Sequence, residues 1–217
     1  MDKMLLIDKP AGITSHDVVS RVRRIFDTRK VGHAGTLDPF ATGLLILGVG
    51  KKTKELTNLI GLDKTYEATA LLGVTSDTYD PEGVKTETNP KMYERPNLES
   101  IDKALEKFRG SYEQKAPLHS AKKIKGRKLY ELARSGEATE EMRPKKEVKI
   151  SELEILNYAW PELKFRVSCS SGTYIRSLAD DIGRELGCGA YLTQLRRTKI
   201  GEFNIQDAVQ LSELSQS

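Results

Sequence analysis

Two segments with alternating apolar and polar residues, followed by an amphipathic segment, set the strongest limit on how this chain folds. Residues 148–156 (VKISELEIL) and 163–170 (LKFRVSCS) have the alternation of half-buried strands, and only the short stretch NYAWPE separates them. Residues 173–187 (TYIRSLADDIGRELG) then place apolar side chains at helical spacing. Neighbouring strands joined so closely, with a helix after them, predict an α+β fold. In this fold a mixed, mostly antiparallel central sheet is flanked by helices.

Other segments fit the same fold class. Further strands are predicted at 4–8, 44–49 and 66–74, and further helices at 14–26, 52–61, 97–110 and 126–136. Thr14 and Asp17 have the spacing of a capping box at the start of the first helix. The acidic segment 77–97, which contains prolines, is the best candidate for a long internal loop. Because no shift in composition divides the chain, we expect one domain over residues 1–217.

The charge is distributed unevenly along the chain. The formal net charge is only +4, but basic residues concentrate at 21–30, 122–128 and 143–149. Local positive surface attracts polyanions such as nucleic acid by releasing their counterions. Solvated helix faces would show the same pattern, so the charge by itself identifies no partner.

Cysteine and histidine usage argues against a metal site. Cys169 and Cys188 are the only cysteines, and neither they nor the three histidines have metal-ligand spacing. The N-terminus lacks the apolar stretch of a signal peptide, and no apolar run is long enough to cross a bilayer. We therefore expect a cytoplasmic protein with no metal and no membrane partner. A monomer is expected because no exposed apolar stripe is evident.

Three residues stand out as candidates for chemistry, and each also has an ordinary structural explanation. Asp38 lies in 32–43 (GHAGTLDPFATG) before a proline, where aspartate commonly starts a turn. Arg176 lies in the first turn of a predicted helix, where a cation opposes the helix dipole unless an anion compensates. It is either a solvated surface residue or the partner of a carboxylate or phosphate. Tyr66 is either a typical strand aromatic or a flat surface for stacking a base.

Six motifs occur in the order found in one known family. They are GHAGTLDPFATGLL (32–45), KTYEA (64–68), SDTYDPEG (76–83), SAKKIKGRKLYELARSG (120–136), SSGTYIRSLADDIG (170–183) and YLTQLRRTKIGEF (191–203). This succession resembles the TruB family of tRNA pseudouridine synthases over about residues 6–203. The resemblance implies the pseudouridine synthase fold. It also implies a cofactor-independent isomerisation of uridine to pseudouridine in the T stem-loop of tRNA.

The resemblance also implies roles for individual residues. Asp38 would be the essential catalytic carboxylate, Arg176 would keep it charged, and Tyr66 would stack on the target uracil. A base must leave its stack before a side chain can reach it, and His33 would fill the vacated space. The other implied site residues are Asp80 and Tyr174 lining the site, Leu195 near the uracil, and Lys54, Arg196 and Arg197 at phosphates.

This chain departs from the family pattern in two places. Ala116 and His119 replace a proline and an aromatic residue in the stretch QKAPLHSA, so the resemblance does not define the path of residues 114–121. The last motif ends close to Ser217, and we therefore expect the C-terminal RNA-binding domain of many members, often a PUA domain, to be absent.

Three other functions remain open at this point. A nucleoside hydrolase would release free uracil, although glycosidases generally use paired carboxylates and this motif offers one aspartate with an arginine. A second alternative is an RNA-binding protein or tRNA-folding chaperone without catalysis. A third is guide-dependent modification, as in the related catalytic subunit of H/ACA particles.

Overall fold

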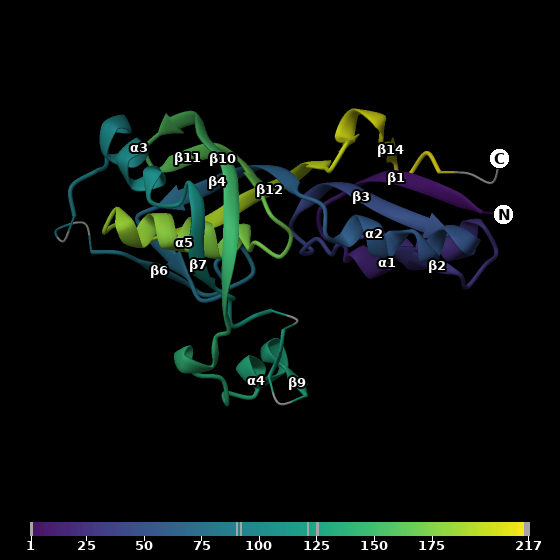
Figure 1. The fold of residues 1–217 in the computed structure, drawn as a ribbon. Helices are drawn as coiled ribbons and strands as arrows, with labels where there is room; N and C mark the ends of the chain where they lie inside the picture. The colour runs from purple at the N-terminus through teal and green to yellow at the C-terminus, as the bar shows by residue number, and fades with distance from the viewer. Residues whose placement is uncertain (1, 90, 92, 121, 125, 215–217) are drawn as a thin grey trace. The chain divides into compact units, whose positions relative to one another are not determined.

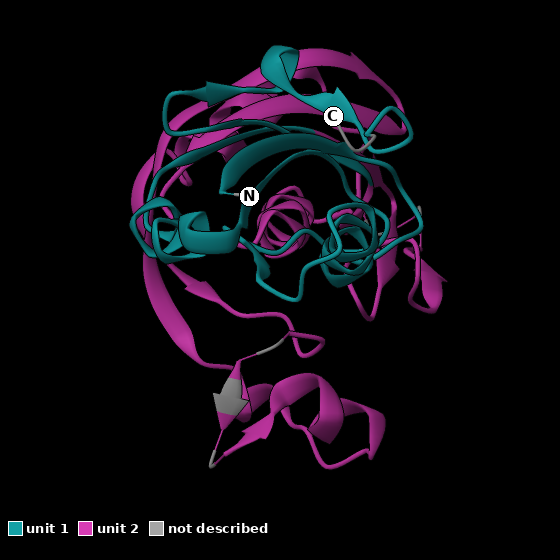
Figure 2. Cartoon of the chain, turned by 90° about the vertical axis from the view of Figure 1, so that its right-hand side faces the viewer, with its two compact units in different colours: residues 1–67, 194–217 teal, residues 68–193 magenta. Residues whose placement is uncertain are grey.

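The computed structural model describes residues 2–89, 91, 93–120, 122–124 and 126–214, which form two compact units. Unit 1 comprises residues 1–67 and 194–217, and unit 2 comprises residues 68–193 (Figure 2). The chain passes between the units within β4 (Lys64–Leu72) and within β12 (Ala190–Ile200). One residue of the basic stretch 122–128, Lys125, lies outside the described residues.

Unit 1 is built on a mixed sheet with the strand order β14-β1-β3-β12. β1 (Lys3–Lys9) is antiparallel to β3 (Thr42–Val49), whereas β14 (Val209–Gln210) is parallel to β1 and β12 is parallel to β3. The short strands β2 (Val31–His33) and β13 (Phe203–Asn204) pair antiparallel with β3 and β12. The helical segments are α1 (Ser15–Ile25), η1 (Gly50–Lys54), α2 (Leu56–Ile60) and η4 (Ile205–Asp207).

β3 is buried on both faces, which explains its unbroken apolar sequence LLILGV. On one face, Leu45 and Leu47 pack in a cluster with three valines of α1, which are Val18, Val19 and Val22. On the other face, Leu44 and Ile46 pack in a second cluster with Leu56 and Ile200. Strands covered on both faces lose the alternation of half-buried ones. The prediction of a buried strand over 44–49 is confirmed.

Unit 2 contains a second set of strands in the order β4-β11-β10-β7. β10 (Lys145–Ala159) is antiparallel to both β11 (Glu162–Cys169) and β7 (Gly110–Lys115). The helices α3 (Leu98–Glu106) and α5 (Ile175–Glu185) and the hairpin of β5 (Val74–Ser76) with β6 (Lys85–Glu87) complete this part. The predicted hairpin of 148–156 with 163–170 is confirmed, as is the helix within 173–187. The α+β class with mixed, mostly antiparallel pairing is confirmed as well.

A small lobe of unit 2, residues 116–144, leaves the sheet after β7 and returns at the start of β10 (Figure 1). It contains β8 (Lys123–Ile124), β9 (Arg127–Lys128), α4 (Leu129–Arg134) and η3 (Glu140–Met142). Hydrogen bonds close its base. The Ala116 amide donates to the Pro144 carbonyl at 3.0 Å, and Arg143 Nε donates to the Ala116 carbonyl at 2.8 Å.

Local structure differs from the sequence-based expectation in three segments. The predicted helix 52–61 is divided into η1 and α2, and the predicted helix 126–136 begins with the strand β9 before α4. The third segment is 77–97. This segment was expected to be a loop, but it contains β6, which pairs with β5. All three residues of β6 are exposed, so no apolar alternation marks it as a strand. Among the described residues, no helix has both the length and the apolar character needed to span a membrane.

Candidate active site

The loop of residues 32–43 presents Asp38 at a tight turn. The Ala41 amide donates to the Asp38 carbonyl at 3.1 Å, and the Gly12 amide donates to the Pro39 carbonyl at 2.8 Å. The Asp38 side chain is half-buried. The Asp-Pro sequence thus forms the turn that its composition predicts.

Ser15, the first residue of α1, forms hydrogen bonds with this loop. The Leu37 amide donates to Ser15 Oγ at 2.9 Å, and the same hydroxyl donates to the Leu37 carbonyl at 3.2 Å. Next to it, the predicted capping box is confirmed, because the Thr14 amide donates to the Asp17 carboxylate at 2.8 Å and the Asp17 amide donates to Thr14 Oγ1 at 3.1 Å. The start of α1 is therefore capped, and its first residue, Ser15, holds the backbone of Leu37, the residue before Asp38.

Lys9 is a buried cation that binds backbone carbonyls around the same turn. Its side chain is inaccessible to solvent, and Nζ donates to the carbonyls of Pro10 at 2.9 Å, Ile13 at 2.7 Å and Pro39 at 3.2 Å. Burial lowers the pKa of Lys9 to about 8, while the negative charge of Asp38 acts in the opposite direction. Lys9 therefore fixes the residue that follows Asp38 and contributes positive charge near it.

Arg197 is a second buried cation on the loop, with a residue exposure of only 1%. Nε donates to the Leu44 carbonyl at 2.8 Å, while Nη2 and Nη1 donate to the carbonyls of Gly35 at 3.1 Å and Thr36 at 3.3 Å. One guanidinium thus ties together the two ends of the loop. This environment differs from the phosphate contact expected for Arg197, because a buried side chain bonded to three carbonyls is not open to RNA.

Gly43, at the end of the loop, permits this close packing. Its φ is +105°, and an added Cβ would lie 2.3 Å from the Arg197 carbonyl oxygen. Only glycine combines that backbone conformation with that contact. Gly43 therefore serves the fit between this loop and β12.

The neighbouring Arg196 has a different environment. It donates to both carboxylate oxygens of Asp8, at 3.1 and 2.7 Å, and its side chain is 41% exposed. Gln210 Nε2 also donates to Asp8, at 3.2 Å. Arg196 therefore joins β12 to β1 while part of its surface stays accessible.

The other predicted site residues of unit 1 lie on separate elements. Tyr66 and Leu195 are buried in β4 and β12, and Lys54 is exposed at the end of η1. His33 is half-buried at the end of β2. Burial lowers the pKa of His33, and the positive charges of Arg197 and His16 lower it further, so its imidazole is uncharged near neutral pH.

In unit 2, Arg176 is buried and binds a carboxylate. Nη1 donates to Asp80 Oδ2 at 3.0 Å and to the Thr78 carbonyl at 2.9 Å, and Nη2 donates to the His119 carbonyl at 3.1 Å. Both side chains of the Arg176–Asp80 ion pair are only 6% exposed. Arg176 is thus not a solvated surface residue, and Asp80 is an anion that offsets its unfavourable position at the start of α5.

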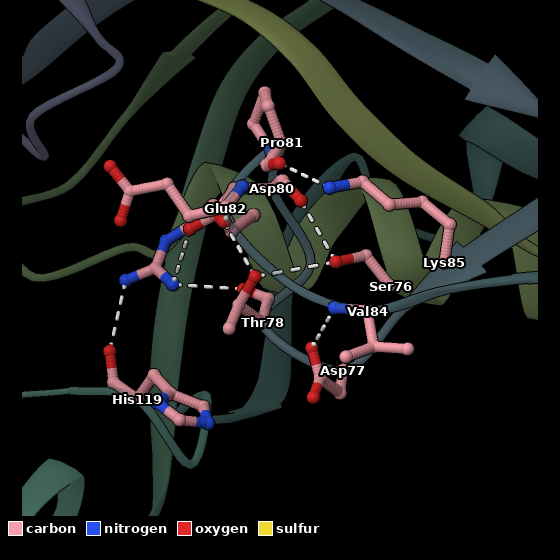
Figure 3. Close-up of polar contacts among 10 residues, drawn as sticks. Ser76, Asp77, Thr78, Asp80, Pro81, Glu82, Val84, Lys85 and His119 are labelled. Carbon is pink, nitrogen blue, oxygen red and sulfur yellow. Dashed lines mark hydrogen bonds and ion pairs between the residues drawn. The ribbon is translucent and has the colours of Figure 1, made fainter. Parts of the chain in front are cut away.

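The loop between β5 and β6 holds Asp80 in place (Figure 3). Thr78 Oγ1 donates to Asp80 Oδ1 at 2.5 Å, and the Glu82 amide donates to the same oxygen at 3.0 Å. Ser76 Oγ donates to the Asp80 carbonyl at 2.8 Å. Hydrogen-bond donors therefore reach both carboxylate oxygens of Asp80.

Tyr174, immediately before α5, is fixed through its backbone. Its amide donates to Gln114 Oε1 at 2.8 Å, and Gln114 Nε2 donates to its carbonyl at 3.0 Å. The two departures from the family pattern also contribute through main-chain atoms, since the carbonyls of Ala116 and His119 accept the bonds from Arg143 and Arg176. These contacts do not depend on the identity of the two side chains.

The predicted site residues fall in two sets. Arg176, Asp80 and Tyr174 belong to unit 2, and the others belong to unit 1, namely His33, Asp38, Lys54, Tyr66, Leu195, Arg196 and Arg197. Sequence reasoning missed the supporting residues Lys9, Ser15, Thr78 and Gln114. The only available signal was for Lys9, a charged residue that directly continues the apolar strand MLLID. Within the described part of the chain, no group of three or more His, Cys, Asp or Glu residues is arranged to hold a metal ion.

Two family models match consecutive parts of the chain. The family model "TruB family pseudouridylate synthase (N terminal domain)" matches residues 23–175, and "tRNA pseudouridylate synthase B C-terminal domain" matches residues 176–217. The chain is 47% identical to a tRNA pseudouridine synthase B of Aromatoleum aromaticum, covering 99% of this chain and 68% of that protein. It is 45% identical to the protein of the same name from Chlamydia pneumoniae, covering 95% of this chain and 86% of that protein.

Two solved structures have the same fold over 97% of this chain. One is a Cbf5–Nop10–Gar1 complex, with a TM-score of 0.74 and 29% identity, and the other is an H/ACA ribonucleoprotein bound to a substrate RNA containing 2′-deoxyuridine, with a TM-score of 0.72 and 27% identity. The chain spans about half the length of the matched chains in these structures, 53% and 51%. From its sequence matches over nearly the whole chain, the protein belongs to the TruB family of pseudouridylate synthases.

Proposed function

We propose that this protein isomerises a uridine in the T loop of tRNA to pseudouridine, with Asp38 as its essential catalytic carboxylate. Family membership and relatives named tRNA pseudouridine synthase B support this reaction and this RNA. The observation that carries the proposal is the contrast within the loop 32–43. Lys9 and Arg197 are buried and fix its backbone, whereas Asp38 itself is only half-buried. A rigid support for an accessible reactive group is what catalysis by positioning requires.

The reaction is a redox-neutral isomerisation, so its atoms and electrons balance without a co-substrate. The N1–C1′ bond breaks, the uracil turns, and C5 bonds to C1′; the proton on C5 is released and N1 gains a proton. An ionised carboxylate at the nucleotide serves either as a nucleophile or as a stabiliser of developing positive charge. We assign this role to Asp38, the supporting cation to Arg176, and stacking on the uracil to Tyr66.

The remaining residues bind and admit the substrate. The target base has to leave the folded T loop, and an uncharged His33 suits the space between bases that it vacates. Asp80 acts through Arg176, to which it is bonded. We assign Tyr174 and Leu195 to the lining of the site, and Lys54 and the exposed part of Arg196 to RNA phosphates.

The proposal is tested by tritium release from a T stem-loop RNA labelled at uracil C5, without a guide RNA or any other protein. Wild-type protein releases one tritium for each pseudouridine formed. Asp38→Asn releases none above background while still binding the RNA. Asp63→Asn, which changes an exposed aspartate of the same unit, is the matched control and retains activity.

Other outcomes identify the competing functions. Free uracil without pseudouridine indicates a nucleoside hydrolase, and RNA binding without any tritium release indicates a chaperone. Release that begins only after a guide RNA is added indicates guide-dependent modification. Equal release by wild type and Asp38→Asn contradicts the role assigned to Asp38.

A further inference from the structure

Four lysines lie near the base of the lobe in unit 2. β7 ends at Lys115 and β10 begins at Lys145, and these two residues lie directly opposite each other in the antiparallel ladder. Lys146 follows on β10, and Lys122 lies in the adjoining segment of the lobe; all four are exposed. Like charges directly opposite on neighbouring strands destabilise a sheet. An anion bound here would remove that repulsion.

Existing contacts compensate these charges only in part. Lys145 forms an ion pair with Glu113 at 2.7 Å, but both side chains are more than half exposed, and pairs of this kind contribute little stability. Lys146 Nζ donates to the Ser171 carbonyl at 2.9 Å, which fixes its direction without neutralising its charge.

Three of these lysines line one small cavity. Its volume is about 170 Å³, and Lys122, Lys145 and Lys146 surround it together with Gln114, Gly172 and Tyr174. The described lining residues include no carboxylate. Pockets for whole small molecules run from roughly 300 to 1,000 Å³, so this cavity is too small for a nucleotide and suits a single anionic group.

The cavity adjoins the segment that leads to Arg176. Gly172 and Tyr174 belong to the turn just before α5, and Arg176 is the second residue of that helix. At Gly172, an added Cβ would lie 2.7 Å from Lys146 Nζ. Because Gly172 has no side chain, the Lys146 side chain can extend past it to the cavity.

We propose that this lysine-lined cavity binds a backbone phosphate of the substrate RNA close to the modified nucleotide. The inference rests on the proposed function, since it assumes an RNA substrate at Arg176. A phosphodiester group is small enough for the cavity, and its negative charge complements the lysines that line it. The cavity also lies beside the start of α5, the helix that carries Arg176. The three ammonium groups bind it as point charges, without selecting a base.

The test compares RNA binding by the double variant Lys145→Glu/Lys146→Glu with binding by the wild type. We expect the Kd for a T stem-loop to rise about tenfold near 0.1 M salt, with the loss appearing in KM more than in kcat. The slope of log K against log salt concentration decreases by about 0.7–0.9 for each phosphate that the variant no longer neutralises. Lys145→Gln/Lys146→Gln gives a smaller effect of the same sign, and thermal unfolding verifies that both variants fold.

A matched control separates the cavity from general surface charge. Lys103→Glu/Lys107→Glu makes the same charge change in the same unit, at the last turn and the C-cap of α3, where both lysines line another cavity. We expect this variant to bind RNA as the wild type does. An equal loss of affinity in both double variants overturns the proposal, as does an unchanged Kd and salt slope in Lys145→Glu/Lys146→Glu.

Substitution in the RNA identifies the contact. Replacing single phosphates of the stem-loop by uncharged methylphosphonates weakens wild-type binding at the phosphate that occupies the cavity. Binding by Lys145→Glu/Lys146→Glu does not change when that phosphate is replaced. If each single replacement weakens binding by this variant as much as by the wild type, the proposal is overturned. These experiments measure RNA binding, so a negative result refutes the phosphate site without refuting the proposed function. The proposed function is refuted separately, if wild-type protein releases no tritium.

Discussion

Arg176 and Asp80 form a buried ion pair in unit 2, with Nη1 and Oδ2 3.0 Å apart and both side chains 6% exposed. The pair joins the first turn of α5 to the loop between β5 and β6. A cation at a helix start opposes the helix dipole, and a buried guanidinium without a nearby anion would cost several kcal/mol. Asp80 therefore determines both where Arg176 lies and whether it is tolerated there.

Removing the charge of Asp80 is expected to reduce stability and catalysis together. Asp80→Asn leaves a buried guanidinium without its anion, so the free energy of unfolding decreases by about 3 kcal/mol. Urea denaturation measures this loss, and single-turnover tritium release at saturating RNA measures the accompanying decrease in rate. Asp77→Asn is the control, since Asp77 lies in the same loop but is exposed. Similar losses in both variants would contradict the special role of Asp80.

Substitution of Arg197 is expected to affect the rate more than RNA binding. Arg197→Lys cannot reach the carbonyls of Gly35, Thr36 and Leu44 at once, and each buried acceptor left unsatisfied costs about 1–3 kcal/mol. The loop then holds Asp38 less firmly, and we expect the single-turnover rate to decrease at least about tenfold with less than a twofold change in Kd. The neighbouring Arg196→Lys should have the smaller effect on the rate. A larger effect of Arg197→Lys on Kd than on rate would indicate a phosphate contact instead.

Lys9 is expected to make stability depend on pH in the alkaline range. Its pKa is about 8 in the folded protein and 10.5 in a solvated lysine, so between these values the unfolded chain binds the extra proton. The free energy of unfolding contributed by this group therefore increases as the pH rises through that window. Lys9→Met should show a flatter dependence between about pH 8 and 10.5 in chemical denaturation. Parallel curves for wild type and variant would show that the pKa of Lys9 is not lowered.

Asp181 on α5 gives the opposite dependence at acidic pH. Burial, together with the negative charge of Asp180, raises its pKa to about 6 from 3.8, so the folded protein binds the extra proton between these values. Its contribution to stability is present below pH 3.8 and is lost as the pH rises toward 6. We expect Asp181→Asn to be more stable than wild type at pH 7, with a smaller difference at pH 4, in urea unfolding at both values. A variant that is less stable at pH 7 would contradict this account.

The sequence by itself determined most of the local structure. Alternation identified the hairpin of β10 and β11, helical spacing identified α1, α3 and α5, and the capping box located the start of α1. These features depend on which residues near one another in the chain share a face, and periodicity encodes that directly. The motif order also identified the family, because Asp38, Tyr66 and Arg176 occur in characteristic neighbouring sequence.

Only the tertiary structure decided what the charged side chains contact. Arg176 and Asp80 are 96 residues apart, and their contact depends on how α5 packs against the loop between β5 and β6. Arg196 and Arg197 are adjacent and look alike in the sequence, yet one forms a partly exposed ion pair and the other is buried in the Asp38 loop. Successive residues of a strand point to opposite faces, so their surroundings are set by the elements packed on each face. No local pattern contains that information.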